Sequence, residues 1–396
     1  MKQSAVIIIP TYNERENIER TVQEILKVFV KISDWKMRIL VVDDSSPDKT
    51  YEVVREMHKK HSNVSLLLNK EKSGLGGAYL AGMAHAFGTL GADVVFEFDA
   101  DLSHDPTKIP LFLQKIAGGA DFVLGSRYIP GGSMPKNWGI HRKFMSRAAN
   151  ILISLVFANF AIKDWTSGYR AITKKVYEQV HPLLHSGLFS GYTFQIGFLY
   201  YALRKGFKID PNVAYHFVDR TAGESKMGPE YLVKPLVFIF DMRIREIIAM
   251  RVFKFLVVGA TGAGVQLGSL MLYRFLLPSF DAGFFTTFFV ASFLSIESAI
   301  IINFILNNGW TFADRKLEQG KKLWKFLQFN LTSVGSIVIQ LALAAVGEAT
   351  IGLRPLFTLP IINFTIESGL VFAVSGILLG MGWNFFAYNK FIWKKK

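Results

Sequence analysis

Hydrophobic and polar positions follow two different patterns along the chain, and the change falls near residue 231. Up to about Tyr231 the apolar runs are short and interrupted by charged residues, as in a soluble α/β domain. After Arg251 long apolar stretches dominate, which predicts membrane helices. We therefore expect a soluble domain over 1–230, a joining segment over 231–251 and a transmembrane domain over 252–396.

The first part predicts strands and helices in alternation. Apolar runs rich in β-branched residues are typical of buried parallel strands. They occur at Val6–Ile9, Ile39–Val42, Val64–Leu68, Val94–Phe98 and Asp121–Gly125. Apolar residues from Ile18 to Phe29 recur at helical spacing, and a helix of small residues is predicted near Gly77–Ala86. This order predicts a doubly wound, Rossmann-like and mostly parallel sheet, which binds ligands outside the carboxyl ends of its strands.

The second part predicts helices at and in a membrane. Segment 231–251 mixes basic and bulky apolar residues, which predicts interfacial helices; one amphipathic helix packed on the soluble domain is the alternative. Four apolar stretches follow, each about long enough to span the hydrocarbon core: 252–276, 284–308, 325–347 and 360–388. Glu297, Asn303, Asn307 and Glu367 interrupt them, so these helices are expected to face each other or a polar cavity.

An internal repeat organises this membrane part. Lys254-Phe255-Leu256 with Gly264 matches Lys325-Phe326-Leu327 with Gly335. Asn303-Phe304 with Asn308 likewise matches Asn384-Phe385 with Asn389. Two copies of one pattern predict two related helical hairpins, which together make a four-helix domain.

Basic residues predict how that domain is oriented. The middle connection carries Arg315, Lys316, Lys321 and Lys322, and the tail carries Lys390, Lys394, Lys395 and Lys396. The opposite connections offer only Arg354. Because basic loops stay on the cytoplasmic side, we expect a multi-pass protein of the cell membrane, with both termini and the soluble domain in the cytoplasm.

The net charge and the amino-acid composition indicate which classes of partner to expect. A formal charge of +14 indicates anionic partners: nucleic acid, a phosphorylated substrate or a lipid surface. The membrane segments favour the last two, so we expect contact with the lipid bilayer and no nucleic-acid partner. The chain has no cysteine, which excludes a disulfide framework and a thiol nucleophile.

Candidate chemistry gathers where the predicted strands end. Asp99 and Asp101 follow an apolar strand with one residue between them, a placement that suits Mg²⁺ or Mn²⁺ bound to a diphosphate. Such a pair can equally serve as caps or salt-bridge partners. Segments 10–14 and 41–48 bring further polar groups to the same edge. Asp44 could accept hydrogen bonds from a ribose or base, or cap the next helix.

These segments resemble a known family in their order and spacing. The strings VIIIPTYNERENI, VVDDSSPDKT, FEFDADLSHDP, LGSRYIPGG, SGYR and GESK resemble the polyisoprenyl-phosphate glycosyltransferases, and most of all the dolichol-phosphate mannose synthases. The membrane part resembles the GtrA-like four-helix module fused to some members. The resemblance implies a GT-A fold and an inverting transfer of mannose from GDP-mannose to dolichyl or another polyprenyl phosphate.

The resemblance also implies roles for individual residues. The nucleoside would be held by Pro10, Tyr12, Glu14, Val42 and Asp44. The diphosphate would meet Asp99, Ala100 and Asp101, with Asp101 as the main metal ligand. Some members place a Gln ligand at the next-but-one position. Here that position is Ser103, a weaker ligand that could act through water.

The acceptor chemistry follows from the charge of its phosphate. A phosphate monoester is already an anion, so it needs cations to align it rather than a base to activate it; Arg127, Arg142, Arg220 and Lys226 are candidates. Ser146 lies one helical turn beyond Arg142. By resemblance, Arg127 would contact donor phosphate or sugar, and Arg142 and Ser146 would contact the lipid phosphate. Arg220 and Lys226 would come from a mobile loop that closes over the donor.

Two other functions stay open on the sequence. One is transfer of glucose from UDP-glucose to undecaprenyl phosphate, because pocket shape decides base and sugar. The other is a carrier or flippase role for the membrane domain, since polar residues interrupt its spans. The glycine-rich run at 74–77 resembles a dinucleotide fingerprint, but Tyr79 replaces its final glycine, so we interpret it as a tight turn and close helix packing.

Overall fold

The computed structural model describes residues 2–184, 192–219, 230–279, 281–282, 285–352, 354–359 and 364–394. The chain forms two compact units, Met1–Arg243 and Ile244–Lys396. The boundary between these units falls inside one helix, α8 (Glu230–Ala249). The finer division at residues 230 and 251 stays a prediction.

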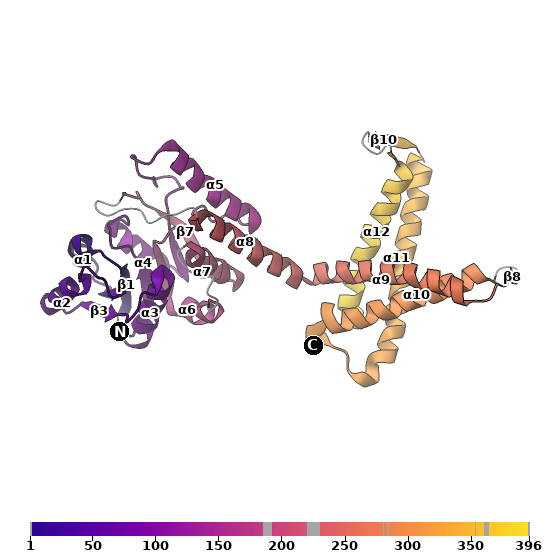
Figure 1. Cartoon of the computed structure of the whole chain (residues 1–396), viewed down its shortest axis with the longest axis horizontal. Helices are drawn as coiled ribbons and strands as arrows, with labels where there is room; N and C mark the ends of the chain where they lie inside the picture. Colours follow the sequence, from indigo (N-terminus) through magenta and orange to yellow (C-terminus); the bar gives the residue numbers. More distant parts are fainter. Residues whose placement is uncertain are drawn as a thin grey trace. The chain divides into compact units, whose positions relative to one another are not determined.

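One sheet forms the centre of the first unit (Figure 1). Its strands are β1 (Gln3–Thr11), β2 (Trp35–Asp43), β3 (Val64–Leu68), β4 (Val94–Glu97), β5 (Phe122–Ser126), β6 (Arg170–Thr173) and β7 (Ile209–Ala214). Their spatial order is β3-β2-β1-β4-β6-β5-β7, and β6 runs antiparallel to both neighbours while the other pairs are parallel. The mostly parallel, Rossmann-like sheet is therefore confirmed. The short strands β6 and β7 were not predicted.

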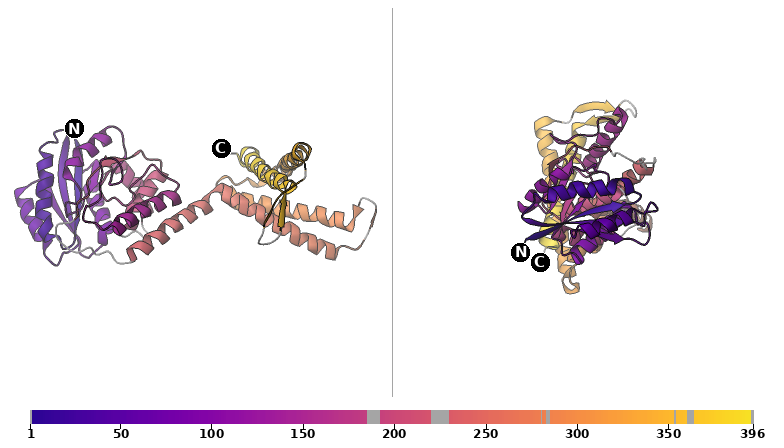
Figure 2. Two further views of the ribbon diagram at one scale, coloured as in Figure 1. Left: turned by 90° about the horizontal axis from the view of Figure 1, so that it is seen from above. Right: turned by 90° about the vertical axis from the view of Figure 1, so that its left-hand side faces the viewer.

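Helices cover both faces of this sheet (Figure 2). One face carries α1 (Arg15–Phe29), α2 (Thr50–Lys60) and α4 (Ile109–Ala117), and the other carries α3 (Gly74–Gly88), α5 (Ile140–Val156), α6 (Lys174–Val180), α7 (Tyr192–Arg204) and part of α8. Alternation along β1 explains both layers, because Ile7 packs toward α1 and Ile8 toward α3. A Cβ at Gly82 of α3 would lie 2.6 Å from Ile8, so a small residue is needed there.

The loops after β1, β2 and β4 contain unusual backbone. Asn13, Ser45 and Leu102 have positive φ angles of 59°, 54° and 58°. A bulky residue such as Leu102 rarely adopts this conformation, and strain of this kind concentrates at functional sites. The carboxyl edge of the sheet is therefore the first place to search for a site. Helix α1 has its N-cap at Glu14.

Two helical hairpins make up most of the second unit (Figure 1). Helix α9 (Arg251–Leu276) pairs with α10 (Thr287–Leu306), and α11 (Lys322–Ile351) pairs with α12 (Ser368–Ala387). Short strands link each pair: β8 (Asp281–Ala282) and β9 (Phe285–Thr286), then β10 (Pro355–Leu359) and β11 (Phe364–Glu367). A π-helical turn follows α10 at Asn307–Thr311 and α12 at Tyr388–Ile392, which supports the internal repeat.

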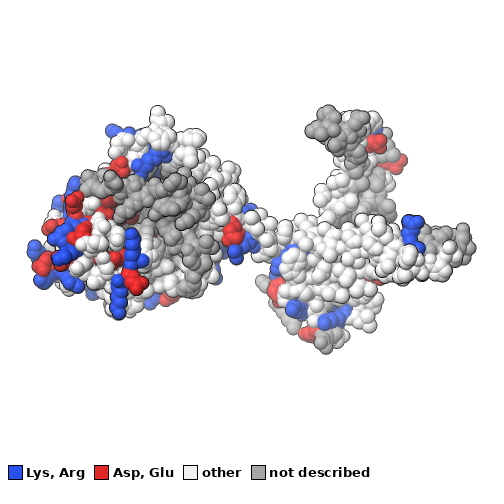
Figure 3. Space-filling model, viewed as in Figure 1, with Lys and Arg blue, Asp and Glu red and all other residues white. Residues whose placement is uncertain are grey.

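Few charged residues interrupt the described surface of the second unit on the face shown in Figure 3, and many of the unit's exposed side chains are large and hydrophobic. Among the described residues, α9 and α11 are long and apolar enough to cross a membrane. These two helices belong to different hairpins. Helices α10 and α12 coincide with two of the predicted spans, but the count of four crossings stays a prediction.

Candidate active site

Asp99 and Asp101 lie in the strained loop that follows β4. The Asp99 carboxylate accepts a hydrogen bond from the Tyr79 hydroxyl at 3.3 Å and lies 3.6 Å from His104 Nε2. The Asp101 carboxylate accepts the backbone N–H of Ser103 at 3.0 Å. The Asp99 side chain is 37% exposed, so a ligand can reach it from solvent. Local hydrogen bonds thus hold both carboxylates at the edge of the sheet.

His104 packs against this loop from the interior of the protein. Its ring is buried and stacks on Tyr169 with centroids 4.8 Å apart. Its Nδ1 accepts the backbone N–H of Asp99 at 3.1 Å. Burial lowers the pKa of His104 to about 3, so the ring is neutral at pH 7 and its Nε2–H faces the Asp99 carboxylate. We interpret His104 as a positioning residue.

The residues at this loop fit a divalent metal. Asp99 and Asp101 supply hard carboxylate oxygens, which Mg²⁺ and Mn²⁺ prefer. The Ser103 hydroxyl is buried and has no hydrogen-bond partner among the described residues, so Ser103 as a third ligand stays a prediction. The described residues contain no group of three or more His, Cys, Asp or Glu arranged for a metal. A metal here would therefore depend on diphosphate oxygens and water to complete its coordination.

The predicted nucleoside residues lie at the ends of β1 and β2. Pro10 and Val42 are paired neighbours in the parallel ladder, and the Val42 side chain is fully buried, so only its backbone could meet a ligand. Tyr12 lies under Lys72, with Nζ 3.7 Å from the ring centroid. Glu14 accepts a hydrogen bond from Asn17 at 2.9 Å.

Asp44 caps a helix. Its carboxylate accepts the backbone N–H groups of Ser73 and Gly74 at 2.9 and 3.0 Å, at the start of α3. It also accepts from the Asn69 amide at 2.7 Å. The sequence left nucleoside binding and capping of the next helix open. The observed hydrogen bonds are of the capping kind, but they lie at α3, while Asp48 accepts the Thr50 N–H at the start of the next helix, α2. The buried Ala100 contributes its carbonyl to a hydrogen bond with Thr21 on α1.

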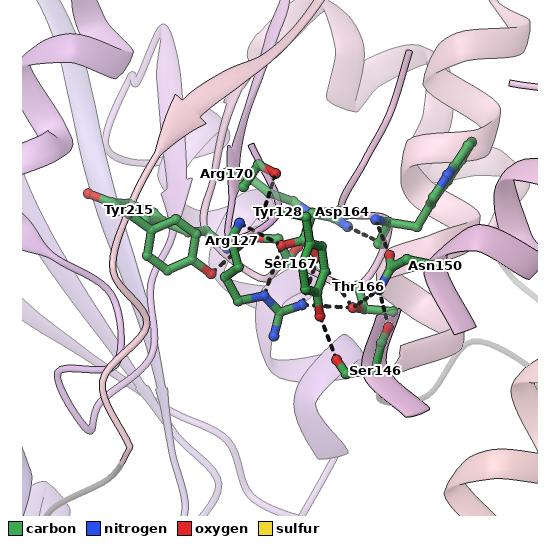
Figure 4. Close-up of polar contacts among 12 residues, drawn as sticks. Arg127, Tyr128, Ser146, Asn150, Asp164, Thr166, Ser167, Arg170 and Tyr215 are labelled. Carbon is green, nitrogen blue, oxygen red and sulfur yellow. Dashed lines mark hydrogen bonds and ion pairs between the residues drawn. The ribbon is translucent and has the colours of Figure 1, made fainter. Parts of the chain in front are cut away.

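Arg127 forms a buried ion pair just after β5 (Figure 4). Its Nε and Nη2 donate to the two oxygens of Asp164 at 2.8 and 2.7 Å, and Nη2 also donates to Thr166 at 2.9 Å. Asp164 is fully buried. A bidentate pair of this kind fixes the guanidinium plane. Direct contact between Arg127 and donor phosphate therefore stays a prediction. In the sequence, the only signal for its partner Asp164 was nearness to the SGYR string.

Ser146 and Arg142 lie on α5, as predicted. The Ser146 hydroxyl is 2.5 Å from the Tyr128 hydroxyl, which ties α5 to the end of β5 (Figure 4). Arg142 lies over the ring of Trp138, with its guanidinium carbon 3.8 Å from the ring centroid. Contact of these residues with a lipid phosphate is untested. Arg220 and Lys226 lie outside the described residues.

Buried polar side chains lie behind the loop that carries Asp99 and Asp101. Arg170 on β6 donates to the backbone carbonyls of Ser167 and Gln195 at 2.8 Å each, and its Nε is 3.8 Å from Glu97 Oε2. Burial raises the pKa of Glu97 to about 7, against the opposing effect of Arg170. Arg170 and the Gln195 side chain are polar neighbours of Glu97 and both lower its pKa, but among the described residues neither the Glu97 carboxylate nor the Gln195 amide makes a hydrogen bond of good geometry. A carboxylate inside an otherwise apolar strand was the available signal for this layer.

Two known families match the chain. Residues 6–180 match glycosyl transferase family 2, and residues 254–393 match the GtrA/DPMS transmembrane domain. The first match covers β1 to α6, including the paired carboxylates. The second covers both hairpins, so the chain is a membrane protein.

Three curated relatives extend these matches. The dolichol-phosphate mannosyltransferase of Pyrococcus furiosus is 33% identical over 84% of this chain and 87% of its own length. The polyprenol monophosphomannose synthase of Mycolicibacterium smegmatis is 36% identical over 61% of this chain and 88% of its own length. The undecaprenyl-phosphate mannosyltransferase of Micrococcus luteus is 39% identical over 56% of this chain and 86% of its own length.

The sheet, its acidic carboxyl edge and the family match define the class of this protein as a glycosyltransferase with a GT-A-like fold. Within glycosyl transferase family 2, the chain belongs to the polyisoprenyl-phosphate mannose synthases and carries a GtrA-type transmembrane domain.

Proposed function

We propose that this enzyme transfers mannose from GDP-mannose to dolichyl or another polyprenyl phosphate, giving the lipid phosphate mannose and GDP. The observation that carries the proposal is the overlap of the sequence matches with the site. Three relatives named for mannose and a polyisoprenyl phosphate align with more than half of this chain. The family match includes Asp99 and Asp101 on a solvent-accessible edge.

The proposed reaction is a single displacement with inversion. An oxygen of the lipid phosphate attacks the anomeric carbon, and the bond from that carbon to the diphosphate oxygen breaks. GDP leaves with the electron pair of the broken bond. Because the acceptor is already an anion, no proton has to be removed from it, and the protein needs mainly to orient the two substrates.

A divalent metal, Mg²⁺ or Mn²⁺, completes the proposed site. Asp99 and Asp101 would hold it, and its charge would stabilise the diphosphate leaving group. Tyr79 and His104 orient the Asp99 carboxylate for that purpose. The nucleoside would lie along the ends of β1 and β2, near Tyr12.

The acceptor side would be cationic. Arg142 and Ser146 on α5 would bind the lipid phosphate, and Arg220 and Lys226 would close over the donor. Holding a lipid acceptor beside a membrane-anchored enzyme raises the effective concentration of that acceptor. We propose that the second unit anchors the enzyme in this way, with four spans and both termini in the cytoplasm, since basic residues gather in the middle connection and the tail.

A donor and acceptor panel tests the proposed reaction. The purified full chain would be incubated with Mn²⁺, a polyprenyl phosphate, and labelled GDP-mannose or UDP-glucose. We expect labelled lipid from GDP-mannose alone, and the label should sit on the opposite anomeric face from that of the donor. Labelled lipid from UDP-glucose alone would replace the mannose assignment with the glucosyl alternative.

Exchange of the second unit tests the anchor. The chain truncated after about Met250 and joined to foreign transmembrane helices should keep most of its transfer activity on membrane-embedded acceptor. Loss of transfer in this chimera, with an intact first unit, would favour a carrier or flippase role. Full turnover by a detached soluble domain would argue against any anchoring contribution.

A further inference from the structure

The second unit contains a cavity that the reaction described above does not use. Its volume is about 390 Å³, and residues of all four long helices or their terminal turns line it. Phe255 and Phe329 provide aromatic walls. Asn303, Asn307 and Asn384 provide polar groups on the same lining. The volume falls within the range of about 300–1,000 Å³ that is typical of sites for small ligands.

The three asparagines present unpaired acceptors. The Oδ1 atoms of Asn303, Asn307 and Asn384 are buried and have no hydrogen-bond partner among the described residues. Asn307 is 1% exposed, and its Nδ2 donates to the Asn303 backbone carbonyl at 2.9 Å, which fixes the orientation of the amide. A buried acceptor without a donor is costly, so a ligand that brings donors would stabilise this site.

Packing holds one of these amides in place. A Cβ added at Gly262 of α9 would lie 2.3 Å from the amide atoms of Asn303. The glycine therefore makes room for the polar side chain at a close contact between helices. Small residues commonly allow such approach in membrane helices, and polar groups in membrane segments commonly mark functional sites.

The lining of the cavity argues against water alone as its occupant, because apolar walls offer water no hydrogen bonds. Most of the wall is apolar, including Phe255, Val258, Phe329 and Met381. A ligand with hydroxyl donors and a carbon skeleton would satisfy both kinds of surface.

The cavity lies near the basic end of the unit. Arg251 begins α9 and Lys322 begins α11, and the lining positions on these helices fall within the first two or three turns. From Arg251 to Gly259 the rise along the helix is about 12 Å. On α10 and α12 the lining residues come from the opposite, carboxyl ends. This depth is accessible to the head group of a lipid in one leaflet.

The internal repeat also converges on this cavity. Asn303 and Asn384 are equivalent positions, and Asn307 corresponds to Tyr388, which lines the cavity as well. The two π-helical turns begin at Asn307 and Tyr388. Such turns are rare and frequently accompany functional sites.

We propose that this cavity binds the uncharged, hydroxyl-rich head group of a lipid. Hydroxyls of the head group donate to the amide oxygens of Asn303, Asn307 and Asn384, and its carbon atoms pack against Phe255 and Phe329. Among the described residues that line the cavity there is no Lys or Arg to pair with a phosphate, which favours a neutral head group. The same chemistry is offered by a glycosyl lipid and by a lipid with a glycerol head group.

Photolabelling in a membrane tests this proposal. The full chain is reconstituted in nanodiscs of phosphatidylcholine, whose head group lacks hydroxyls. The probe is an alkyl β-glucoside with a diazirine next to the sugar, and labelled peptides are located by mass spectrometry. We expect label on peptides that contain Phe255–Ala260 or Met381–Tyr388. A probe with the same chain and a trimethylammonium head group should label these peptides far less.

Matched substitutions separate the cavity from the bulk membrane. Asn384→Leu keeps a similar size and removes one acceptor, so we expect labelling to fall about fivefold. Asn307→Leu serves as a second variant if the first does not fold. Gln340→Leu is the control, because Gln340 is about 16 Å along α11 from Phe329 and does not line the cavity. Its labelling should match that of the unsubstituted chain.

Competition then identifies the source of the head group. Displacement of the probe by an uncharged glycosyl diacylglycerol points to a glycosyl lipid, and displacement by a monoacylglycerol points to a glycerol head group; either result supports the site. Equal labelling by the hydroxyl-free probe would overturn the proposal. So would unchanged labelling in a folded Asn384→Leu variant, or an unlabelled cavity, which would then hold water only.

Discussion

The two units bury polar groups in different ways. In the first unit, Arg127 pairs with Asp164, and Arg170 donates to the carbonyls around it. In the second unit, the amide oxygens of Asn303 and Asn384 are buried without a donor among the described residues. One unit therefore has internal partners for its buried cations, while the other leaves acceptors around a cavity.

The exceptions in the first unit sharpen this contrast. Its unpaired buried atoms include those of Glu97, Ser103 and Gln195, in or behind the loop that carries Asp99. In both units, unpaired polar atoms thus occur where a ligand site is proposed. Buried atoms without a partner also occur elsewhere among the described residues, at Ser4, Trp138, Thr173 and Thr311, so such an atom does not by itself mark a site. Each one costs free energy. The predictions below test whether this contrast reports function.

Loss of a metal ligand should have the largest effect. Asp101→Ala removes a carboxylate from the edge of the sheet, and we expect transfer to fall at least about a thousandfold, or about 4 kcal/mol of transition-state stabilisation. The thermal unfolding midpoint should barely change, because the side chain is not part of the core. Labelled-lipid formation with saturating Mn²⁺ is the measurement.

A nearby carboxylate provides the control for that experiment. Asp105→Ala removes an acid four residues away whose side chain caps a short helix by accepting from Thr107. Transfer should stay within a few fold of the unsubstituted chain, with a stability loss of about 1 kcal/mol. Preserved activity in Asp101→Ala would remove the metal assignment and, with it, the functional meaning of the unpaired atoms behind the loop.

Breaking the buried ion pair should be the next largest effect. Asp164→Asn leaves the Arg127 guanidinium buried without its counter-charge, and removal of one member of such a pair costs about 3–5 kcal/mol. The free energy of unfolding, measured in detergent, should fall by that amount. The partly exposed pair of Lys115 and Asp210 is the matched control, since Asp210→Asn should cost under about 1 kcal/mol. Equal losses in both variants would contradict the distinction.

The sequence predicted the edge of the sheet better than the layer behind it. Asp99 and Asp101 could be found because parallel strands bring their carboxyl ends together, so local strand patterns imply a shared edge. The partner of Arg127 could not, because Asp164 is 37 residues away and reaches it through the loop before the unpredicted antiparallel strand β6. Which carboxylate pairs with which cation depends on packing across the sheet.

The same limit applies to the second unit. Apolar stretches and the repeat predicted helices close to α9–α12, and the interrupting polar residues led to the expectation of a polar cavity or mutual contacts. Spacing could not decide between those two, because it does not specify which donors an amide meets. The outcome depends on close contacts such as that between Gly262 and Asn303.

The pH dependence of stability tests the buried carboxylate Glu97. Its pKa is about 7 in the folded protein against an ordinary value of 4.5. Between these values the folded protein holds a proton that the unfolded chain has released, so the stability from this group falls as the pH rises from about 4.5 to 7. Unsubstituted protein should therefore lose stability relative to Glu97→Gln across this window, by at most about 1.4 kcal/mol per pH unit.

That comparison should be made with chelator present, because a bound cation would change the local charge. Unfolding in detergent at several pH values gives the difference between the two proteins. A difference that does not vary with pH would mean that Arg170 and Gln195 fully offset the burial of Glu97 and keep its pKa ordinary. The first unit would then satisfy this buried group as well, which would sharpen its contrast with the second unit.

The smallest effect concerns the close contact that holds the cavity amide. Gly262→Ala places a Cβ within 2.3 Å of Asn303, and such overpacking costs about 1–3 kcal/mol. Gly264→Ala on the same helix meets open space, so it should gain up to about 1 kcal/mol from helix propensity. Thermal unfolding in detergent measures both, and opposite signs are expected. If both variants gain stability, Asn303 can leave its position freely. Packing would then not hold its amide at the cavity, which would contradict a preformed ligand site in the second unit.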